Sequence, residues 1–167
     1  SNFINTSMSK NINDKYIRVM KMSTENPTIQ DQLVIEQQGV VGVIGLNRIS
    51  SLNALSLDMI NGIRTQLELW QQDQTVQAVL IKSNSPKAFC VGGDIRYLYD
   101  CYKNGTGGHK AYFSSEYAML NTIRASEKPV IVLLDGYVLG GGFGLAQACH
   151  ILISSEKSRF AMPETAI

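Results

Sequence analysis

The sequence predicts an α/β fold in which most strands are parallel. Short apolar runs rich in β-branched residues alternate along the chain with segments of helical periodicity, and glycine-rich turns separate several of them. The 167 residues suffice for one domain with a substantial core, and 44% of them are hydrophobic against 17% that are charged. We therefore expect one domain over residues 31–167, preceded by a mobile, Asn- and Ser-rich tail over residues 1–30.

The first elements of the domain are expected to be a β-hairpin, a helix and a strand. Two β-rich runs meet at a glycine within residues 33–47, which is typical of a hairpin. Apolar residues then recur at helical spacing through residues 56–73, and Ser56 is placed to cap the first turn. The β-rich run over residues 77–83 is expected to be the next strand.

Two further helices are expected in the middle of the chain. The first runs through residues 94–103 and opens at Asp94, which is placed to cap it. The second is predicted over residues 111–126, and four of its side chains are spaced for one side of the helix: Phe113, Tyr117, Leu120 and Arg124. A strand over residues 130–135, a glycine turn with a helix, and a strand over residues 151–154 complete the order.

Three consecutive glycines, Gly140 to Gly142, stand where an apolar run ends and an amphipathic pattern begins. Glycine loses more backbone freedom on folding than any other residue, so a triplet indicates a sharp turn or a close approach to a ligand. When a strand leads through a glycine turn into a helix, the unpaired N–H groups and the positive end of the helix dipole face the same point. Such a point stabilises negative charge.

The residues after the triplet indicate which kind of negative charge is bound. A phosphate-binding P-loop needs Lys and Ser or Thr after its glycines, whereas Phe143 and Gly144 stand here. The spacing also fails to supply the G-x-G-x-x-G fingerprint of a dinucleotide site. The remaining use is an oxyanion hole, in which two backbone donors meet a carbonyl oxygen as it becomes negative in the transition state.

A second pair of glycines can supply the other donor. Gly92 and Gly93 follow an apolar run, and Asp94 opens a helix directly after them. If both glycine turns lie at the same ends of adjacent parallel strands, roughly 4.8 Å apart, their N–H groups can converge on one oxygen. Each loop taken alone also fits an ordinary strand-to-helix turn.

Charge and cysteine usage exclude several other classes of protein. A net charge of +1 and the lack of a basic stripe argue against a nucleic-acid partner, and no apolar run is long enough for a membrane span. Three cysteines without C-x-x-C spacing support neither a disulfide framework nor a zinc site, and they favour a reducing compartment. The chain has only two histidines and no G-x-S-x-G motif, so it lacks the residues expected of a conventional serine or cysteine hydrolase.

The chain resembles the crotonase (enoyl-CoA hydratase/isomerase) superfamily in four successive segments: LNRISSLNALS, KAFCVGGDI, KPVIVLLDGYVLGGGFGLA and SSEKSRFAMPETAI. The resemblance runs from about Leu33 to Ile167 and implies the ClpP/crotonase fold, a spiral of ββα units, incomplete at the C-terminus. It also implies an acyl-CoA thioester as substrate, whose carbonyl is held by the N–H groups of Gly93 and Gly141.

The same resemblance implies which residues bind the substrate. Asn53, Ala54 and Leu55 match the segment that lies along the CoA. Further substrate-binding positions fall on residues of the two glycine turns: Gly92, Asp94, Gly140 and Gly144. The resemblance implies neither a metal nor a separate cofactor, because CoA is part of the substrate, and it is compatible with a homo-oligomer.

Departures from the superfamily pattern narrow the expected activity. Its hydratases carry one catalytic glutamate after the glycine triplet and another in a later Pro-Glu pair; Gly144 stands at the first place and Glu164 at the second. Adding water across a double bond uses two carboxylates, so the missing one argues against an efficient hydratase. The segments GGGFGLA, FAMPETAI and EYAMLNTI most resemble the branch of the superfamily that cleaves 3-hydroxyisobutyryl-CoA in valine breakdown. Glu164 would act as nucleophile or as general base, and a further acidic residue is expected downstream.

Other interpretations stay open at this point. The nearest alternative is a double-bond isomerase, which also needs only one carboxylate, and the next is a weak hydratase. A third alternative is a non-catalytic fragment that only binds CoA. Because the sequence stops directly after its Pro-Glu segment, we expect it to be the N-terminal portion of a longer protein. A cytoplasmic location is expected, with the mitochondrial matrix as alternative because four basic and two acidic residues precede Pro27.

Overall fold

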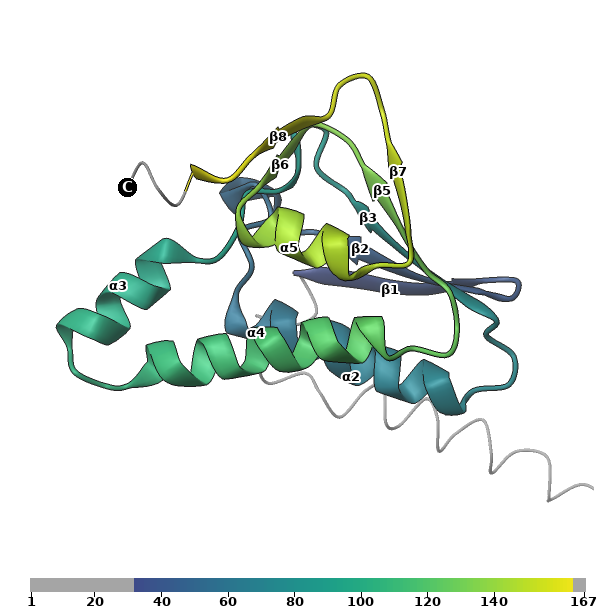
Figure 1. Ribbon diagram of the computed structural model, residues 1–167, viewed down its shortest axis with the longest axis horizontal. Coiled ribbons are helices and arrows are strands. Elements are labelled where there is room, and N and C mark those ends of the chain that lie inside the picture. Colours follow the sequence, from purple (N-terminus) through teal and green to yellow (C-terminus); the bar gives the residue numbers. More distant parts are fainter. Residues whose placement is uncertain (1–31, 164–167) are drawn as a thin grey trace, which may run out of the picture.

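The computed structural model describes residues 32–163, which form two β-sheets and the helices packed against them (Figure 1). The larger sheet has five strands in the order β1 (Leu33–Gln38), β2 (Val41–Leu46), β3 (Ala78–Ser83), β5 (Val130–Leu134) and β7 (Ile151–Ser154). The smaller sheet has the order β4 (Ala88–Cys90), β6 (Tyr137–Leu139) and β8 (Arg159–Ala161). Only the β1–β2 hairpin is antiparallel among these pairings, so the predicted α/β fold with largely parallel strands is confirmed.

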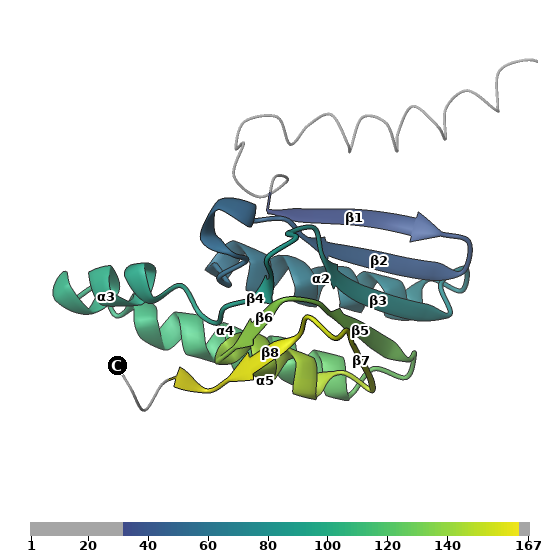
Figure 2. The ribbon, with the colours of Figure 1, turned by 90° about the horizontal axis from the view of Figure 1, so that it is seen from above.

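The helical elements are η1 (Ile49–Ser51), α2 (Leu57–Gln72), α3 (Ile95–Lys103), α4 (Gly108–Arg124) and α5 (Gly141–Ala148). The two long helices, α2 and α4, run alongside each other below the five-stranded sheet in Figure 1, and α3 projects beyond both. Figure 2 shows the strands of the larger sheet stacked from β1 to β7, with the short strands of the smaller sheet at one end. The mobile tail expected over residues 1–30 lies outside the described residues.

Helix α2 begins and ends as its sequence predicts. The Ser56 hydroxyl accepts a hydrogen bond from the Met59 N–H at 3.1 Å, which confirms the expected N-cap. Its buried face carries Met59, Ile60, Ile63, Leu67 and Trp70. At the other end, the Lys128 ammonium donates to the carbonyl oxygens of Trp70 and Asp73, the second at 2.7 Å. A cation therefore lies beside carbonyl groups at the negative end of the helix dipole.

Helix α4 differs from the prediction in its packed face. It begins at Gly108, and its buried side chains are Tyr112, Met119, Leu120 and Ile123. Of the four side chains predicted to share one side of the helix, only Leu120 is buried, whereas Phe113 is 43% and Tyr117 64% exposed. The Tyr112 hydroxyl donates to the Leu55 carbonyl oxygen at 2.7 Å, and this buried contact sets the rotation of the helix.

The apolar residues on either side of Asp135 and Gly136 form two strands in different sheets. β5 belongs to the larger sheet and β6 to the smaller one, and the chain passes between them at Gly136. Gly136 has a φ of +71°, and a Cβ added there would lie 2.1 Å from the Lys87 carbonyl oxygen. Glycine is therefore needed where the chain leaves one sheet and enters the other.

Candidate active site

The parallel pairing of β4 and β6 brings the two glycine turns together. Ala88 aligns with Tyr137 and Cys90 with Val138, so both strands lead to their glycine turns in the same direction. The predicted placement of the turns at the same ends of adjacent parallel strands is confirmed. Both turns then lead into helices, α3 after the first and α5 after the second.

The backbones of the two turns approach each other closely. A Cβ added at Gly92 would lie 3.4 Å from the backbone nitrogen of Gly141, and one added at Gly141 would lie 3.5 Å from the nitrogen of Gly93. Gly92 also has a φ of +104°, which side chains disfavour. Any larger residue at these positions would come between the two turns.

The N–H groups of Gly93 and Gly141 are available to a ligand. Neither donates a hydrogen bond to an acceptor within residues 32–163. The Gly141 N–H is at the first residue of α5, where N–H groups lack partners in the preceding turn and the helix dipole is positive. Two free donors on adjacent turns form the arrangement that an oxyanion hole requires.

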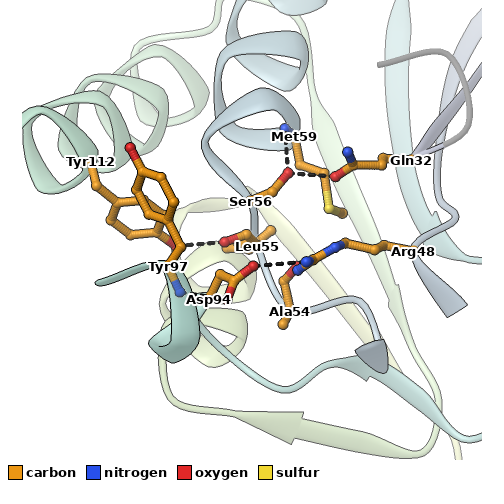
Figure 3. A network of polar contacts seen from close by, with 9 residues as sticks. All are labelled: Gln32, Arg48, Ala54, Leu55, Ser56, Met59, Asp94, Tyr97 and Tyr112. Atoms are coloured by element: carbon orange, nitrogen blue, oxygen red, sulfur yellow. Dashed lines mark hydrogen bonds and ion pairs between the residues drawn. The ribbon is translucent and has the colours of Figure 1, made fainter. Parts of the chain in front are cut away.

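Leu55 holds the first glycine turn in place through its backbone. Its N–H donates to the Gly92 carbonyl oxygen at 2.8 Å, and its own carbonyl oxygen accepts from the Asp94 N–H at 3.0 Å. The Tyr112 hydroxyl bonds the same carbonyl oxygen, as Figure 3 shows. The Leu55 side chain is fully buried, so only the backbone of this residue can serve a ligand.

Asn53 lies behind the site. Its side chain is fully buried, and its amide nitrogen donates to the Ser83 hydroxyl at 2.8 Å and to the Phe89 carbonyl oxygen at 3.0 Å. The buried side chain of Asn53 therefore cannot reach a ligand in this structure, which differs from the contact with CoA that the resemblance implied. Its amide instead ties the loop that carries Ala54 and Leu55 to β3 and β4.

An open pocket of about 710 Å³ begins at Gly93. Ala54 and Asp94 line it as well, together with residues of η1 and of the first turns of α3. Arg48 and Arg96 contribute positive charge to its border, and Asp94 and Asp100 contribute negative charge. The pocket can thus hold a polar portion of a ligand next to one of the two free N–H groups.

The remaining predicted positions surround the second glycine turn. The Gly140 N–H donates to the Ala161 carbonyl oxygen at 3.0 Å, so β8 holds this residue. A Cβ added at Gly144 would meet no other atom of the described residues within 4 Å, so among them the start of a side chain has open space. Glu164 lies outside the described residues, although Ala161, three positions earlier in the sequence, already contacts the glycine triplet.

Glu116 is a site residue that sequence reasoning missed. A Cβ added at Gly141 would lie 2.9 Å from Glu116 Oε1, which places this carboxylate directly beside the second free N–H group. Burial raises the pKa of Glu116 above its ordinary value. Burial also raises the pKa of the neighbouring Tyr112 phenol, and the negative charge of Glu116 adds to that shift. A half-buried carboxylate with a raised pKa is suited to proton transfer or to binding a hydroxyl group.

A sequence model of the family described as "Enoyl-CoA hydratase/isomerase" matches residues 41–167. The chain belongs to this enoyl-CoA hydratase/isomerase family. Among solved structures of this fold, an enoyl-CoA hydratase from Rhodobacter sphaeroides 2.4.1 is 36% identical, with a TM-score of 0.78 over 81% of this chain and 41% of that one. A carnitinyl-CoA dehydratase from Mycobacterium thermoresistibile is 28% identical, with a TM-score of 0.80 over 82% of this chain and 40% of that one. The crotonase fold predicted from the sequence is thus confirmed.

Curated relatives in the enoyl-CoA hydratase/isomerase family carry a more specific name. The mitochondrial 3-hydroxyisobutyryl-CoA hydrolase of Xenopus laevis is 45% identical over 85% of this chain, and this chain spans 37% of that protein. The protein of the same name from Homo sapiens is 41% identical over 82% of this chain, which spans 36% of it. Their names place these relatives in mitochondria and give no support to the expected cytoplasmic location.

No helix in the described part of the chain is long and apolar enough to cross a membrane. Residues 32–163 also contain no group of three or more His, Cys, Asp or Glu side chains arranged to hold a metal ion.

Proposed function

We propose that the whole protein hydrolyses 3-hydroxyisobutyryl-CoA to 3-hydroxyisobutyrate and free CoA, in the mitochondrial matrix. The observation that carries this proposal is the pair of free N–H groups, Gly93 and Gly141, on adjacent turns beside a half-buried carboxylate. The curated relatives named for this hydrolysis supply the acyl group and the location. CoA enters as part of the substrate, and the proposed reaction uses no separate cofactor or metal.

In the proposed reaction, the thioester carbonyl oxygen accepts hydrogen bonds from the N–H groups of Gly93 and Gly141. Attack on the carbonyl carbon moves negative charge onto this oxygen, and donors already in place need no reorganisation. Each such donor contributes about 3 kcal/mol of transition-state stabilisation in known enzymes. The CoA portion then extends from Gly93 into the pocket bordered by Arg48 and Arg96.

Glu164 is proposed to supply the nucleophile. As a general base it takes a proton from water, the water oxygen attacks the carbonyl carbon, and the C–S bond breaks to release the CoA thiolate. As a nucleophile its own oxygen attacks, CoA leaves, and water hydrolyses the resulting mixed anhydride. A single turnover in oxygen-labelled water separates the two routes, because label enters the Glu164 carboxylate only by the second one.

Glu116 is proposed to bind the acyl group. It lies beside Gly141, and therefore close to the position that the carbonyl oxygen takes in the proposed complex. The 3-hydroxyl group of the substrate is two carbons from that carbonyl, within reach of a neighbouring carboxylate. The ionised form of Glu116 accepts a hydrogen bond from this hydroxyl group and selects 3-hydroxyacyl thioesters over unsubstituted ones.

The test is the release of free thiol from 3-hydroxyisobutyryl-CoA by the full-length protein, with the double-bond absorbance of crotonyl-CoA followed in parallel. Thiol release with an unchanged double bond is the expected result. Loss of the double bond without thiol release would instead assign a hydratase, the activity named for the Rhodobacter sphaeroides structural neighbour. Binding of CoA without either reaction would leave only a binding function.

A further inference from the structure

We propose that Arg48 is a positioning residue that fixes the Gly93 N–H donor, an inference that rests on the proposed function. Arg48 lies outside the glycine turns and forms none of the oxyanion contacts itself. Figure 3 shows its guanidinium group between the loop that carries Ala54 and the turn that carries Asp94. Its two contacts join the chain segments on either side of the donor.

The guanidinium group of Arg48 binds two acceptors through different nitrogens. Nη2 forms an ion pair with Asp94 Oδ2 at 2.8 Å, and Nη1 donates to the Ala54 carbonyl oxygen at 3.0 Å. Ala54 directly precedes Leu55, and Asp94 directly follows Gly93. Because Leu55 and Gly93 form an isolated parallel β-bridge, Arg48 connects the neighbours of both bridge residues.

The first glycine turn needs such a connection. Glycines at positions 92 and 93 offer no side chain to pack, and the preceding strand β4 has only three residues. Within the described chain, the turn is joined to the loop before α2 by the two backbone bonds of Leu55. The ion pair of Asp94 with Arg48 restrains the same turn. The Arg48 side chain is only 26% exposed and the Asp94 side chain only 15%. Solvent therefore screens this pair less than it screens a surface pair.

Asp94 also connects the glycine turn to helix α3. Its second carboxylate oxygen, Oδ1, accepts a hydrogen bond from the Tyr97 N–H at 3.1 Å and caps the helix. One carboxylate thus holds the start of α3 on one side and Arg48 on the other. Loss of Arg48 would leave the cap intact while freeing the turn, which separates the positioning role from helix capping.

Arginine is suited to this role and lysine is not. A planar guanidinium group presents several N–H donors in fixed directions and can bind two acceptors at once, whereas an ammonium group is a single point charge on a flexible stem. Arg48→Lys therefore keeps the charge next to Asp94 without reproducing the geometry of both contacts. Arg124 provides a matched control, because it is an exposed arginine at the end of α4 that does not line the pocket and forms no ion pair within residues 32–163.

The test compares Arg48→Met, Arg48→Lys and Arg124→Met in the full-length protein, with rates normalised to the folded fraction. We expect kcat for 3-hydroxyisobutyryl-CoA to fall about 10- to 100-fold in Arg48→Met with KM within about twofold, because misplaced groups lose rate rather than affinity. Arg48→Lys should recover part of this loss, and Arg124→Met should leave both kcat and KM unchanged. An unchanged kcat in Arg48→Met, or a higher KM alone, would overturn the proposal and indicate a contact with the CoA phosphates.

A second measurement keeps this inference separate from the proposed function. The carbonyl stretching frequency of isobutyryl-CoA, labelled with heavy carbon at the thioester carbonyl, reports directly on polarisation by the N–H donors. We expect the bound thioester to shift to lower frequency in the wild type, and to shift less in Arg48→Met at equal occupancy. If the wild type releases no thiol, the proposed function fails and the infrared comparison still tests Arg48. An equal shift in both proteins would refute the positioning role.

Discussion

Gly141 and Glu116 lie against each other: a Cβ added at Gly141 would come within 2.9 Å of the Glu116 carboxylate oxygen Oε1. One of these residues belongs to the start of α5 and the other to the middle of α4. Their contact places an acid–base group next to a free backbone donor. Substitutions of both residues therefore test the proposed hydrolysis directly.

Glu116→Gln is expected to reduce kcat/KM for 3-hydroxyisobutyryl-CoA by about 10- to 100-fold, which corresponds to the loss of one hydrogen bond to a charged group. The loss should be smaller with isobutyryl-CoA, which lacks the 3-hydroxyl group that Glu116 is proposed to bind. Steady-state kinetics with both thioesters checks this. Glu127→Gln changes an exposed carboxylate and serves as control. Equal losses for both substrates would exclude a contact with the 3-hydroxyl group.

The same substitution should change the pH dependence of stability. Because burial raises the pKa of Glu116, the folded state binds its proton more tightly than the unfolded state does. The free energy of unfolding therefore falls as pH rises from the ordinary pKa of a glutamate through the raised value. Glu116→Gln removes this loss, so its Tm relative to wild type should increase across that window. A pH-independent difference in Tm would contradict the assignment.

Gly141→Ala is expected to lower kcat by about 100- to 1,000-fold, the range seen when one oxyanion donor is lost. The added Cβ would press on Glu116 Oε1 at 2.9 Å and would lie 3.5 Å from the nitrogen of Gly93, so it would occupy the space beside both donors. Gly62→Ala, in the middle of α2, is the matched control. Its Cβ would meet only a methyl group of Leu33, and kcat should be retained.

Gly144→Glu should add hydratase activity toward crotonyl-CoA. A side chain at position 144 has open space, so the second carboxylate that hydratases of the superfamily use can be accommodated without collision. Loss of the crotonyl double-bond absorbance is the measurement. Gly144→Gln has the same size without the acid–base group. If both variants hydrate equally, or neither does, the assignment of position 144 fails.

Lys128→Met is expected to destabilise the protein by about 1–3 kcal/mol, because carbonyl groups at the end of α2 lose a charged hydrogen-bond donor. The carbonyl oxygens of Trp70 and Asp73 accept from this ammonium group. Urea unfolding followed by the fluorescence of Trp70, the single tryptophan, measures the change. Lys110→Met removes an exposed ammonium group on α4 and should have little effect.

The sequence predicted best what neighbouring residues determine. Ser56 and Asp94 mark the starts of α2 and α3 because a capping side chain bonds an N–H group only three positions away. The two glycine turns were also found correctly, since each closes an apolar run and opens a helix. Their pairing followed from the rule that parallel strands end at the same edge.

The sequence could not show the contacts that fix α4. Its face is set by the Tyr112 hydroxyl, which bonds a carbonyl oxygen 57 positions earlier in the chain. Helical periodicity alone favoured Phe113 and Tyr117, and that choice hid Glu116 from consideration. A usable signal was present, because Glu116 follows Tyr112 by one helical turn and precedes Met119 on the same face. Asn53 likewise needed the structure, since its partners lie on β3 and β4.

The parallel pairing of β4 with β6 also has a consequence for synthesis on the ribosome. β4 and its glycine turn are synthesised before Tyr137, the first residue of their partner strand. Until then β4 presents unpaired backbone groups and the fully apolar side chains of Ala88, Phe89 and Cys90. Such an unpaired edge is prone to aggregation, so slow translation between β4 and β6 should increase the demand for chaperones.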